Sequence, residues 1–199
     1  VRRVVDALGV EEIALVGHDS GGLLCRHAMV GDPRLRAMGL INTEQPNPSF
    51  RFRALLWNRH LPGYGAIVGW LAGRRRLRRN GQAMGDLFVD KSLLEGEFEE
   101  FTLRPLHEDE TTRAALMKAL DSLTMEHVTD LEGIHRRLGV PVELVWGAED
   151  PFFPVDRTRQ MMESLPDAHL TVIPGASLFS QEEAPEAVSQ ALLPVLTGG

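Results

Sequence analysis

The chain has 199 residues, a length that gives one sizeable core with room for an inserted lid. Its 43% hydrophobic and 25% charged residues are ordinary for a globular protein, and a formal net charge of −7 gives no overall attraction to nucleic acid. A single cysteine, Cys25, excludes an intramolecular disulfide and fits a reducing compartment, the cytoplasm. No apolar run reaches the roughly 18–20 residues of a membrane span, so we expect no membrane and no nucleic-acid partner.

The first part of the chain predicts a β-α-β unit. Residues 1–8 place apolar side chains on one helical face and end at Gly9. The apolar run at 13–16 lacks alternation, as expected for a strand buried on both faces of a parallel sheet. A glycine turn, a helix closed near Gly31 and a second strand at 36–42 follow. Strand, turn, helix and strand in this order indicate the α/β class.

The middle of the chain, residues 47–137, is helical or mixed and has no convincing buried strand. In one of its segments, Asp109 or Thr111 could cap a helix that turns Ala115, Leu116, Ala119, Leu120 and Leu123 inward. The basic run at 73–81 is expected to be a solvated face rather than a site for an acidic partner. We predict that the whole segment is a helical lid inserted over the strand ends.

The last part of the chain resumes the alternation of strands and helices. Apolar runs and helical patterns predict a strand, a helix, a strand and a helix over 140–147, 155–165, 169–175 and 182–196. The simplest organisation is a doubly wound, mostly parallel sheet built from residues 1–46 and 138–199.

The loop GHDSGG, which follows the first strand, has the form of a nucleophile turn. Gly17 and Gly21 bracket Asp19 at the two positions where a side chain would collide with neighbouring backbone. The next helix points its positive end at the loop, which favours an ionised Asp19. A second register makes Ser20 the nucleophile but puts His18 at a crowded position. A plain tight turn in which Asp19 only caps the helix is the structural alternative.

Three motifs in chain order resemble the aspartate-nucleophile branch of the α/β-hydrolase family, the haloalkane dehalogenases and epoxide hydrolases. GHDSGG is similar to the family's nucleophile loop, and LVWGAEDPFFP is similar to its acid loop, which implies that Asp150 is the acid of a catalytic triad. Glu44 is the second choice for this acid, because some dehalogenases carry one after that strand. The resemblance implies a small-molecule substrate under the lid, an apolar haloalkane, epoxide or ester, with no cofactor and no metal.

The third motif, VIPGASLFSQEEAPEAV, resembles the segment that carries the catalytic histidine, but Leu178 stands in its place. An ionised carboxylate attacks carbon without a base, whereas hydrolysis of the resulting ester needs one. Losing a positioned general base costs about 10²–10⁴-fold, so we expect a stalled alkyl-enzyme or slow turnover. The other histidines are expected to pack, to lie far away or to be solvated in the lid: His18, His27, His60, His107, His127, His135 and His169.

The residues expected to bind substrate are Ser20, Trp57 and Tyr64. Ser20 follows the nucleophile, where dehalogenases usually have a tryptophan that binds halide. Tyr64 is the one tyrosine available to protonate an epoxide oxygen, and Trp57 could add an indole N–H, although packing is the simpler role for Trp57 and Trp70. No oxyanion loop of the family's form precedes Val1, so the resemblance implies missing first strands. The competing hypothesis is a non-catalytic relative or fragment that binds a ligand or has no independent activity.

Overall fold

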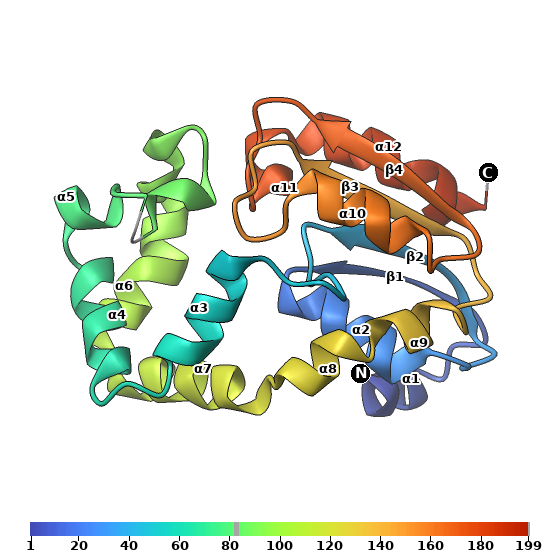
Figure 1. Ribbon diagram of the computed structural model, residues 1–199, viewed down its shortest axis with the longest axis horizontal. Helices are drawn as coiled ribbons and strands as arrows, with labels where there is room; N and C mark the ends of the chain where they lie inside the picture. Colours follow the sequence, from blue (N-terminus) through green and yellow to red (C-terminus); the bar gives the residue numbers. More distant parts are fainter. Residues whose placement is uncertain (82–83, 199) are drawn as a thin grey trace.

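The computed structural model describes residues 1–81 and 84–198, and its centre is a sheet of parallel strands (Figure 1). In the described residues the strand order is β1-β2-β3-β4, with β1 and β4 at the edges. The strands are β1 Ile13–His18, β2 Leu35–Ile41, β3 Val142–Gly147 and β4 Ala168–Ile173. All four were predicted within about two residues, and the α/β class with a parallel sheet is confirmed.

Helices cover both faces of this sheet. Alternate strand residues enter two cores, so that Leu40 and Leu144 join the larger cluster while Ile41 and Val145 join the smaller one. The larger core packs under α2 Ser20–Met29, α9 Leu131–His135 and α10 Val155–Met162, and the smaller core under α12 Pro185–Thr197. The central strands β2 and β3 are therefore buried on both faces, whereas the edge strands β1 and β4 are partly open to solvent, with Val16 of β1 42% exposed.

The segment between β2 and β3 forms a separate group of helices beside the sheet (Figure 1). It contains α3 Phe50–Asn58, α4 Tyr64–Ala72, α5 Arg75–Arg78, η1 Gly85–Leu87, η2 Lys91–Leu94, η3 Glu99–Leu103, α6 Arg104–Glu108, α7 Glu110–Ser122 and α8 Met125–Thr129. A small core of its own holds Ala72, Phe88, Leu94 and Leu103 together. Helix α9 differs, because Leu131 and Ile134 belong to the larger core. The end of the predicted lid, 131–137, thus packs with the sheet.

Two short helices remain: α1 Arg2–Leu8 precedes β1, and α11 Ser180–Glu183 lies between β4 and α12. Helix α7 begins as predicted, and its cap is Asp109 rather than Thr111: the carboxylate accepts from the N–H groups of Thr111 (2.8 Å) and Thr112 (3.2 Å). In the described residues no helix is long and apolar enough to cross a bilayer.

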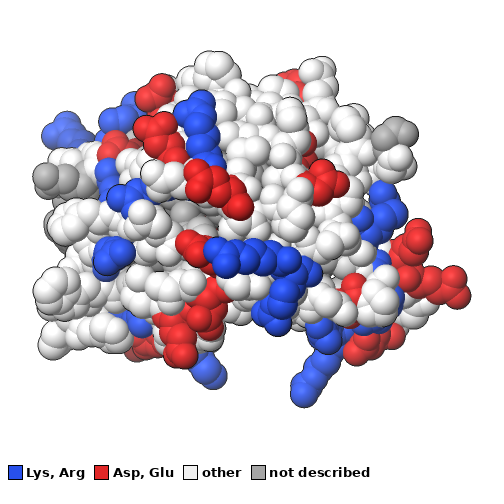
Figure 2. Space-filling model, turned by 45° about the vertical axis from the view of Figure 1, so that its right-hand side comes forward, with Lys and Arg blue, Asp and Glu red and all other residues white. Residues whose placement is uncertain are grey.

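Three of the five arginines of the basic run 73–81 are paired with acidic side chains. Arg75 and Arg79 both contact Glu95 at 2.6 Å, and Arg78 contacts Glu99 at 2.7 Å. The expected solvated face is wrong for Arg78, whose side chain is 2% exposed and also donates to the carbonyl of residue 72. On the face shown in Figure 2, Lys and Arg lie among Asp and Glu and form no large patch of one sign.

Candidate active site

Asp19 occupies a strained turn between β1 and α2. Its φ of 49° and ψ of −133° lie outside the regions that non-glycine residues ordinarily adopt. The Asp19 N–H is shared between the carbonyls of Ile41 (3.2 Å) and Asn42 (3.1 Å), and the Thr43 hydroxyl donates to the Asp19 carbonyl at 2.7 Å. The end of β2 therefore holds this turn on both sides of Asp19. It is Asp19, not Ser20, that carries the strained conformation.

The tight contacts of the turn involve Gly17 and Gly22. A Cβ on Gly17 would lie 2.5 Å from the Gly22 Cα, and a Cβ on Gly22 would lie 2.7 Å from the Thr43 Cβ. A Cβ on Gly21 would meet nothing within 4 Å. The predicted crowding is right at Gly17 and wrong at Gly21, because the first turn of α2 directs Gly22, one residue later, against β1 and the segment after β2.

These contacts predict opposite results for two neighbouring substitutions. Gly22→Ala should destabilise the fold by about 1–3 kcal/mol, because the added methyl overlaps the side chain of Thr43. Gly21→Ala should be neutral or stabilising by up to about 1 kcal/mol, because it lies in a helix with open space around its Cβ. Urea unfolding of both variants measures the difference. Equal stabilities would contradict the placement of α2 against Thr43.

Two further carboxyl groups, Glu44 and Asp150, act on Asp19 at this edge of the sheet. Burial raises the pKa of Asp19 to about 7, and the charges of Glu44 and Asp150 add to the rise in that order. Glu44 is fully buried, and burial also raises the pKa of Asp150 above its ordinary value. At neutral pH about half of the Asp19 carboxyl groups are therefore ionised. In the described part of the chain, no group of three or more His, Cys, Asp or Glu side chains is placed to hold a metal ion.

Asn42 connects the loops that follow three strands, a role the sequence did not indicate. Its amide donates to Asp150 Oδ2 at 2.8 Å, and its Oδ1 accepts from the Gly147 N–H (3.0 Å) and the Ser180 hydroxyl (2.8 Å). Asp150 also accepts from two backbone N–H groups of its own loop, at 2.8 and 3.1 Å. The acid loop is thus fixed relative to the Asp19 turn. A positive φ of 34° at Asn42 accompanies this arrangement.

A buried cation, Arg26, lies beneath the turn. It donates to the carbonyls of Gly22 (3.0 Å) and Glu44 (2.8 Å) and to the Thr43 hydroxyl (2.9 Å). Burial lowers the pKa of Arg26 to about 10, so it stays charged at neutral pH. His135, expected to be a solvated lid residue, is fully buried at 3.0 Å from Arg26 Nη1. Burial lowers the pKa of His135 to about 3, so its neutral ring accepts from the guanidinium.

A cavity of about 360 Å³ opens above Asp19 and is mostly apolar. Its walls come from α3, α4 and α7, from η1 and from the loops after β3 and β4, and its polar members are Asp19, Ser20, Asn58 and Tyr64. Ser20 Oγ lies 3.5 Å from Asp19 Oδ1. Burial raises the pKa of Tyr64, which keeps its hydroxyl a donor at neutral pH. The structure thus brings together Asp19, Ser20 and Tyr64 and adds Asn58, which had not been predicted.

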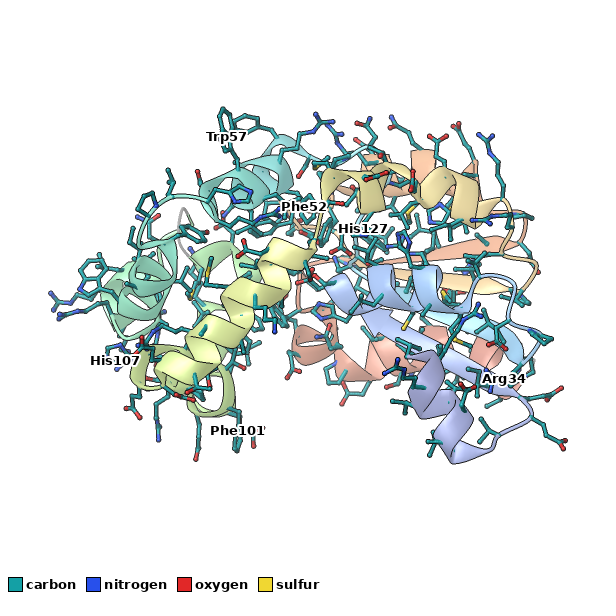
Figure 3. All side chains as sticks on the ribbon, turned by 90° about the horizontal axis from the view of Figure 1, so that it is seen from below. Arg34, Phe52, Trp57, Phe101, His107 and His127 are labelled. Carbon is teal, nitrogen blue, oxygen red and sulfur yellow. The ribbon has the colours of Figure 1, made fainter. Side chains whose placement is uncertain are left out.

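Trp57 lies outside this cavity, which corrects the expectation that it binds substrate. Its side chain is 79% exposed and points away from the molecule (Figure 3). Phe52 and Leu56, four residues apart, form the buried face of α3, and Trp57 follows Leu56 by about 100° around the helix. Trp70 is also half exposed and packs under Arg74. Neither tryptophan supplies an indole N–H to the cavity.

Leu178 lines the same cavity as Asp19 and is 5% exposed. Its carbonyl accepts from His18 Nε2 at 2.9 Å, while the His18 ring packs against Phe179. Burial lowers the pKa of His18. None of the seven histidines, all of which the structure describes, lines the cavity. The loop after β4 therefore contributes a leucine, and no histidine, to the wall of the cavity that Asp19 also lines.

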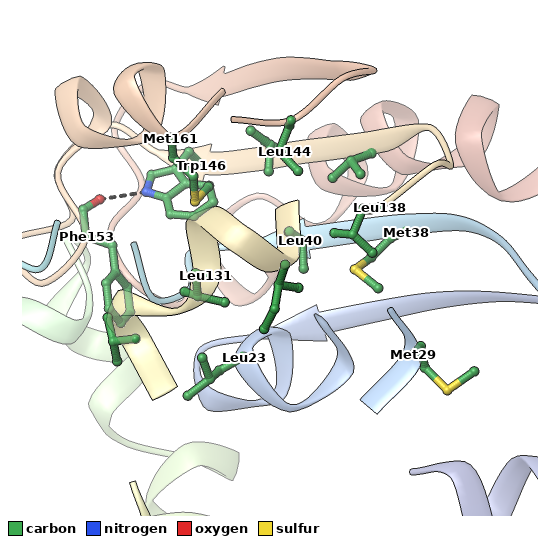
Figure 4. Packing of buried hydrophobic residues seen from close by; sticks show 14 of the residues in the cluster. Leu23, Met29, Met38, Leu40, Leu131, Leu138, Leu144, Trp146, Phe153 and Met161 are labelled. Carbon is green, nitrogen blue, oxygen red and sulfur yellow. Dashed lines mark hydrogen bonds between the residues drawn. The ribbon is translucent and has the colours of Figure 1, made fainter. Parts of the chain in front are cut away.

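The loop that carries Asp150 is anchored in the larger core. The indole of Trp146 is fully buried and donates to the carbonyl of Phe153 at 2.6 Å (Figure 4). Phe153 in turn lines the cavity beside Phe152. This contact fixes the backbone that donates to Asp150, so the acid and one wall of the cavity share a rigid support.

Comparison with known proteins places this geometry in context. The family described as "Alpha/beta hydrolase family" matches residues 1–191. An uncharacterized hydrolase of Bacillus subtilis, YugF, is 24% identical over 190 residues, which cover 94% of this chain and 66% of that protein. A Pseudomonas 2-hydroxy-6-oxononadienedioate/2-hydroxy-6-oxononatrienedioate hydrolase is 24% identical and covers 96% and 65%. The chain therefore spans a little under two thirds of the length of these relatives.

Solved structures show the same fold at low identity. An alpha/beta hydrolase from a Medee basin deep-sea metagenome library superposes with a TM-score of 0.76 at 16% identity and covers 100% of this chain and 69% of its own. A thermophilic esterase from Thermogutta terrifontis gives a TM-score of 0.69 at 21% identity, with 98% and 68% covered.

Proposed function

Since the chain belongs to the alpha/beta hydrolase family, we propose that it acts as a hydrolase with an aspartate nucleophile whose covalent intermediate is long-lived. The observation that carries the proposal is the strained backbone of Asp19 at the mouth of an apolar cavity. In this fold the residue at the turn after the strand is the one presented to substrate. Here that residue is a carboxylate, which forms an ester with an electrophilic carbon without help from a base.

The reaction we propose begins with a small, neutral and apolar electrophile in the cavity. For a haloalkane, an Asp19 carboxylate oxygen forms a bond to carbon while the carbon–halogen bond breaks and its electron pair leaves with the halide. The Ser20 hydroxyl beside Asp19 is placed to donate to that halide. For an epoxide the ring C–O bond breaks instead, and the Tyr64 hydroxyl supplies the proton to the oxygen.

The second half of the proposed reaction is slow. Hydrolysis of the Asp19 ester needs a base that removes a proton from water, and Leu178 cannot act as one. Asp150 is fixed at the site, but its oxygens accept from Asn42 and from its own loop. With the base absent, hydrolysis should be slower by about 10²–10⁴-fold than in a site that has one.

The test is an incubation with a short 1-bromoalkane, followed by intact-mass and peptide-level mass spectrometry. We expect one alkyl group per chain, in place of a proton, on Asp19. Because burial raises the pKa of Asp19 to about 7, the rate of labelling should rise about tenfold from pH 6 to pH 8 as the ionised fraction grows from about 10% to about 90%.

Two variants make this test specific. Asp19→Asn should take up no alkyl group, and Ser20→Ala should still be labelled, since Ser20 only neighbours the attacking oxygen. A label on Ser20 would overturn the choice of nucleophile. A folded sample that is neither labelled nor turns over haloalkanes, epoxides or esters would support a non-catalytic relative instead.

A further inference from the structure

The carboxylate of Glu183, on α11, joins two segments that are far apart in the chain. Its Oε1 accepts from the backbone N–H groups of Val89 (2.6 Å) and Asp90 (3.0 Å), and its Oε2 accepts from the N–H of Ser177 (2.5 Å). Val89 and Asp90 lie between η1 and η2, among the helices inserted between β2 and β3, whereas Ser177 lies in the loop after β4. One side chain therefore connects the inserted helices to the sheet.

These bonds belong to a larger contact between the same two segments. The Ser177 hydroxyl donates to the Asp86 carbonyl at 2.7 Å. The Phe179 N–H donates to the Leu87 carbonyl at 3.3 Å, and the Phe179 ring stacks on Phe88 with 5.1 Å between the ring centroids. The loop after β4 and the segment around η1 thus pack against each other through backbone, hydroxyl and ring contacts.

Two leucines within this contact line the catalytic cavity. Leu178 lies between the two loop residues that bond to the segment around η1, and Leu87 is the last residue of η1. Both line the cavity together with Asp19, whereas Glu183 does not line it. The bonds of Glu183 therefore hold two walls of the cavity in place from outside.

The charge and the shape of the Glu183 carboxylate both matter for these bonds. A carboxylate accepts stronger hydrogen bonds than a neutral oxygen does. A glutamine of the same size would lose the charge and would set an amide N–H₂ against a backbone N–H donor. The preceding residue, Glu182, offers a comparison: its side chain is exposed and makes no hydrogen bond or ion pair with the described residues.

We propose that Glu183 is a positioning residue for the reaction at Asp19. It keeps the segment 86–90 on the loop after β4, and it thereby fixes the cavity walls that Leu87 and Leu178 form. It touches no substrate and takes no part in making or breaking bonds. This role rests on the proposed function, because the reaction that it supports is the alkylation of Asp19.

Amide hydrogen exchange of the full chain measures the contact itself. In Glu183→Gln the peptide 86–90 should exchange at least about tenfold faster than in the parent, because two of its N–H groups lose a charged acceptor. Glu182→Gln is the matched control, since it removes the same charge from the neighbouring position. Exchange of the peptide 86–90 in Glu182→Gln should equal that of the parent.

Binding of 1-hexanol measures the cavity without any chemistry at Asp19, because an alcohol does not alkylate a carboxylate. Ligand-observed NMR should show saturable binding to the parent. The Kd should be at least about fivefold higher for Glu183→Gln, because walls that are no longer fixed in advance must be ordered by the ligand. Glu182→Gln should bind 1-hexanol as the parent does.

Labelling with 1-bromohexane measures the effect on the reaction. In Glu183→Gln the concentration that gives half of the maximal labelling rate should rise at least about fivefold. The pH at half of the maximal rate should fall, because water that enters the loosened cavity weakens the burial that raises the pKa of Asp19 to about 7. The charges of Glu44 and Asp150 stay in place, so this shift reports burial, and a loss of global stability alone would not produce it.

The outcomes separate this role from the proposed function. If the parent is not labelled, the proposed function fails, and exchange and 1-hexanol binding still decide whether Glu183 shapes the cavity. If Glu183→Gln does not fold, Ser177→Ala takes its place, since it removes another bond of the same contact and should change exchange and binding in the same direction. The role of Glu183 is overturned if exchange of 86–90 is unchanged, if 1-hexanol does not bind the parent or binds parent and variant equally, or if a labelled variant keeps the parent's concentration and pH dependence.

Discussion

Replacing Leu178 with histidine is expected to let the protein hydrolyse the proposed Asp19 ester and release product repeatedly. Ester hydrolysis should become faster by about 10²–10⁴-fold, the usual contribution of a positioned general base. Position 178 lines the cavity together with Asp19, and the loop before it contacts the acid loop through a 2.9 Å hydrogen bond from Glu149 N–H to the Ala176 carbonyl. We expect Asp150 to orient an imidazole there, as a carboxylate orients a catalytic histidine.

Halide release and intact mass together measure this change. The parent should release one equivalent of halide and keep the alkyl group, whereas Leu178→His should release many equivalents. Leu178→Gln is the matched control, because glutamine is polar and similar in size but is not a base. Adding Asp150→Asn to Leu178→His should lower turnover again. If the ester in Leu178→His lasts as long as in the parent, position 178 does not correspond to the missing base.

The positions of the strands could be read from the sequence because each strand leaves a local signal, whereas the order of the strands in the sheet was not predicted. Each strand is a short apolar run bounded by turn residues, and the runs at 13–16 and 140–147 lie in β1 and β3. The tight turn at Asp19 could also be predicted, because the glycines of the loop are typical of such a turn. These features depend on neighbours in the sequence.

The features that sequence reasoning missed depend on packing between distant segments. His135 looked like a solvated lid residue, yet it lies against Arg26, 109 positions away in the chain. Asn42 gave no signal, since its partners follow β3 and β4. Trp57 was misplaced because one step around a helix turns a side chain from the core to solvent. In each case the residue type was ordinary, and only the fold determines its surroundings.

At the Asp19 turn, the ionised carboxylate that the proposed reaction needs lowers the stability of the fold. Burial raises the pKa of Asp19, and two further carboxyl groups, Glu44 and Asp150, lie near enough to raise it further. Arg26 lies beneath them, but its hydrogen bonds go to Gly22, Glu44 and Thr43 through carbonyl and hydroxyl oxygens rather than carboxylates. A carboxyl group that ionises in such a place costs stability whenever it is charged.

Asp19→Asn is therefore expected to make the protein more stable as well as unable to form the ester. In the unfolded chain Asp19 has a pKa of about 3.9, and in the folded chain about 7. The folded state thus holds the proton more tightly, and the stability that this proton supplies is lost as pH rises towards 7 and above. Asparagine does not titrate. The stability gap between variant and parent should widen by about 2–3 kcal/mol between pH 5 and pH 8.

Urea unfolding at pH 5, 6, 7 and 8 measures this gap in the free energy of unfolding. In thermal unfolding at pH 8, the Tm of the variant should be roughly 5–10 °C above that of the parent. Asparagine tolerates a positive φ nearly as well as aspartate, so the strained turn adds no new cost. Asp130→Asn is the control, since Asp130 lies at the start of α9 without a side-chain cap hydrogen bond. It should follow the parent at every pH. A gap for Asp19→Asn that does not change with pH would mean that Asp19 titrates as an ordinary carboxyl, and the tenfold pH dependence of labelling would then fail for the same reason.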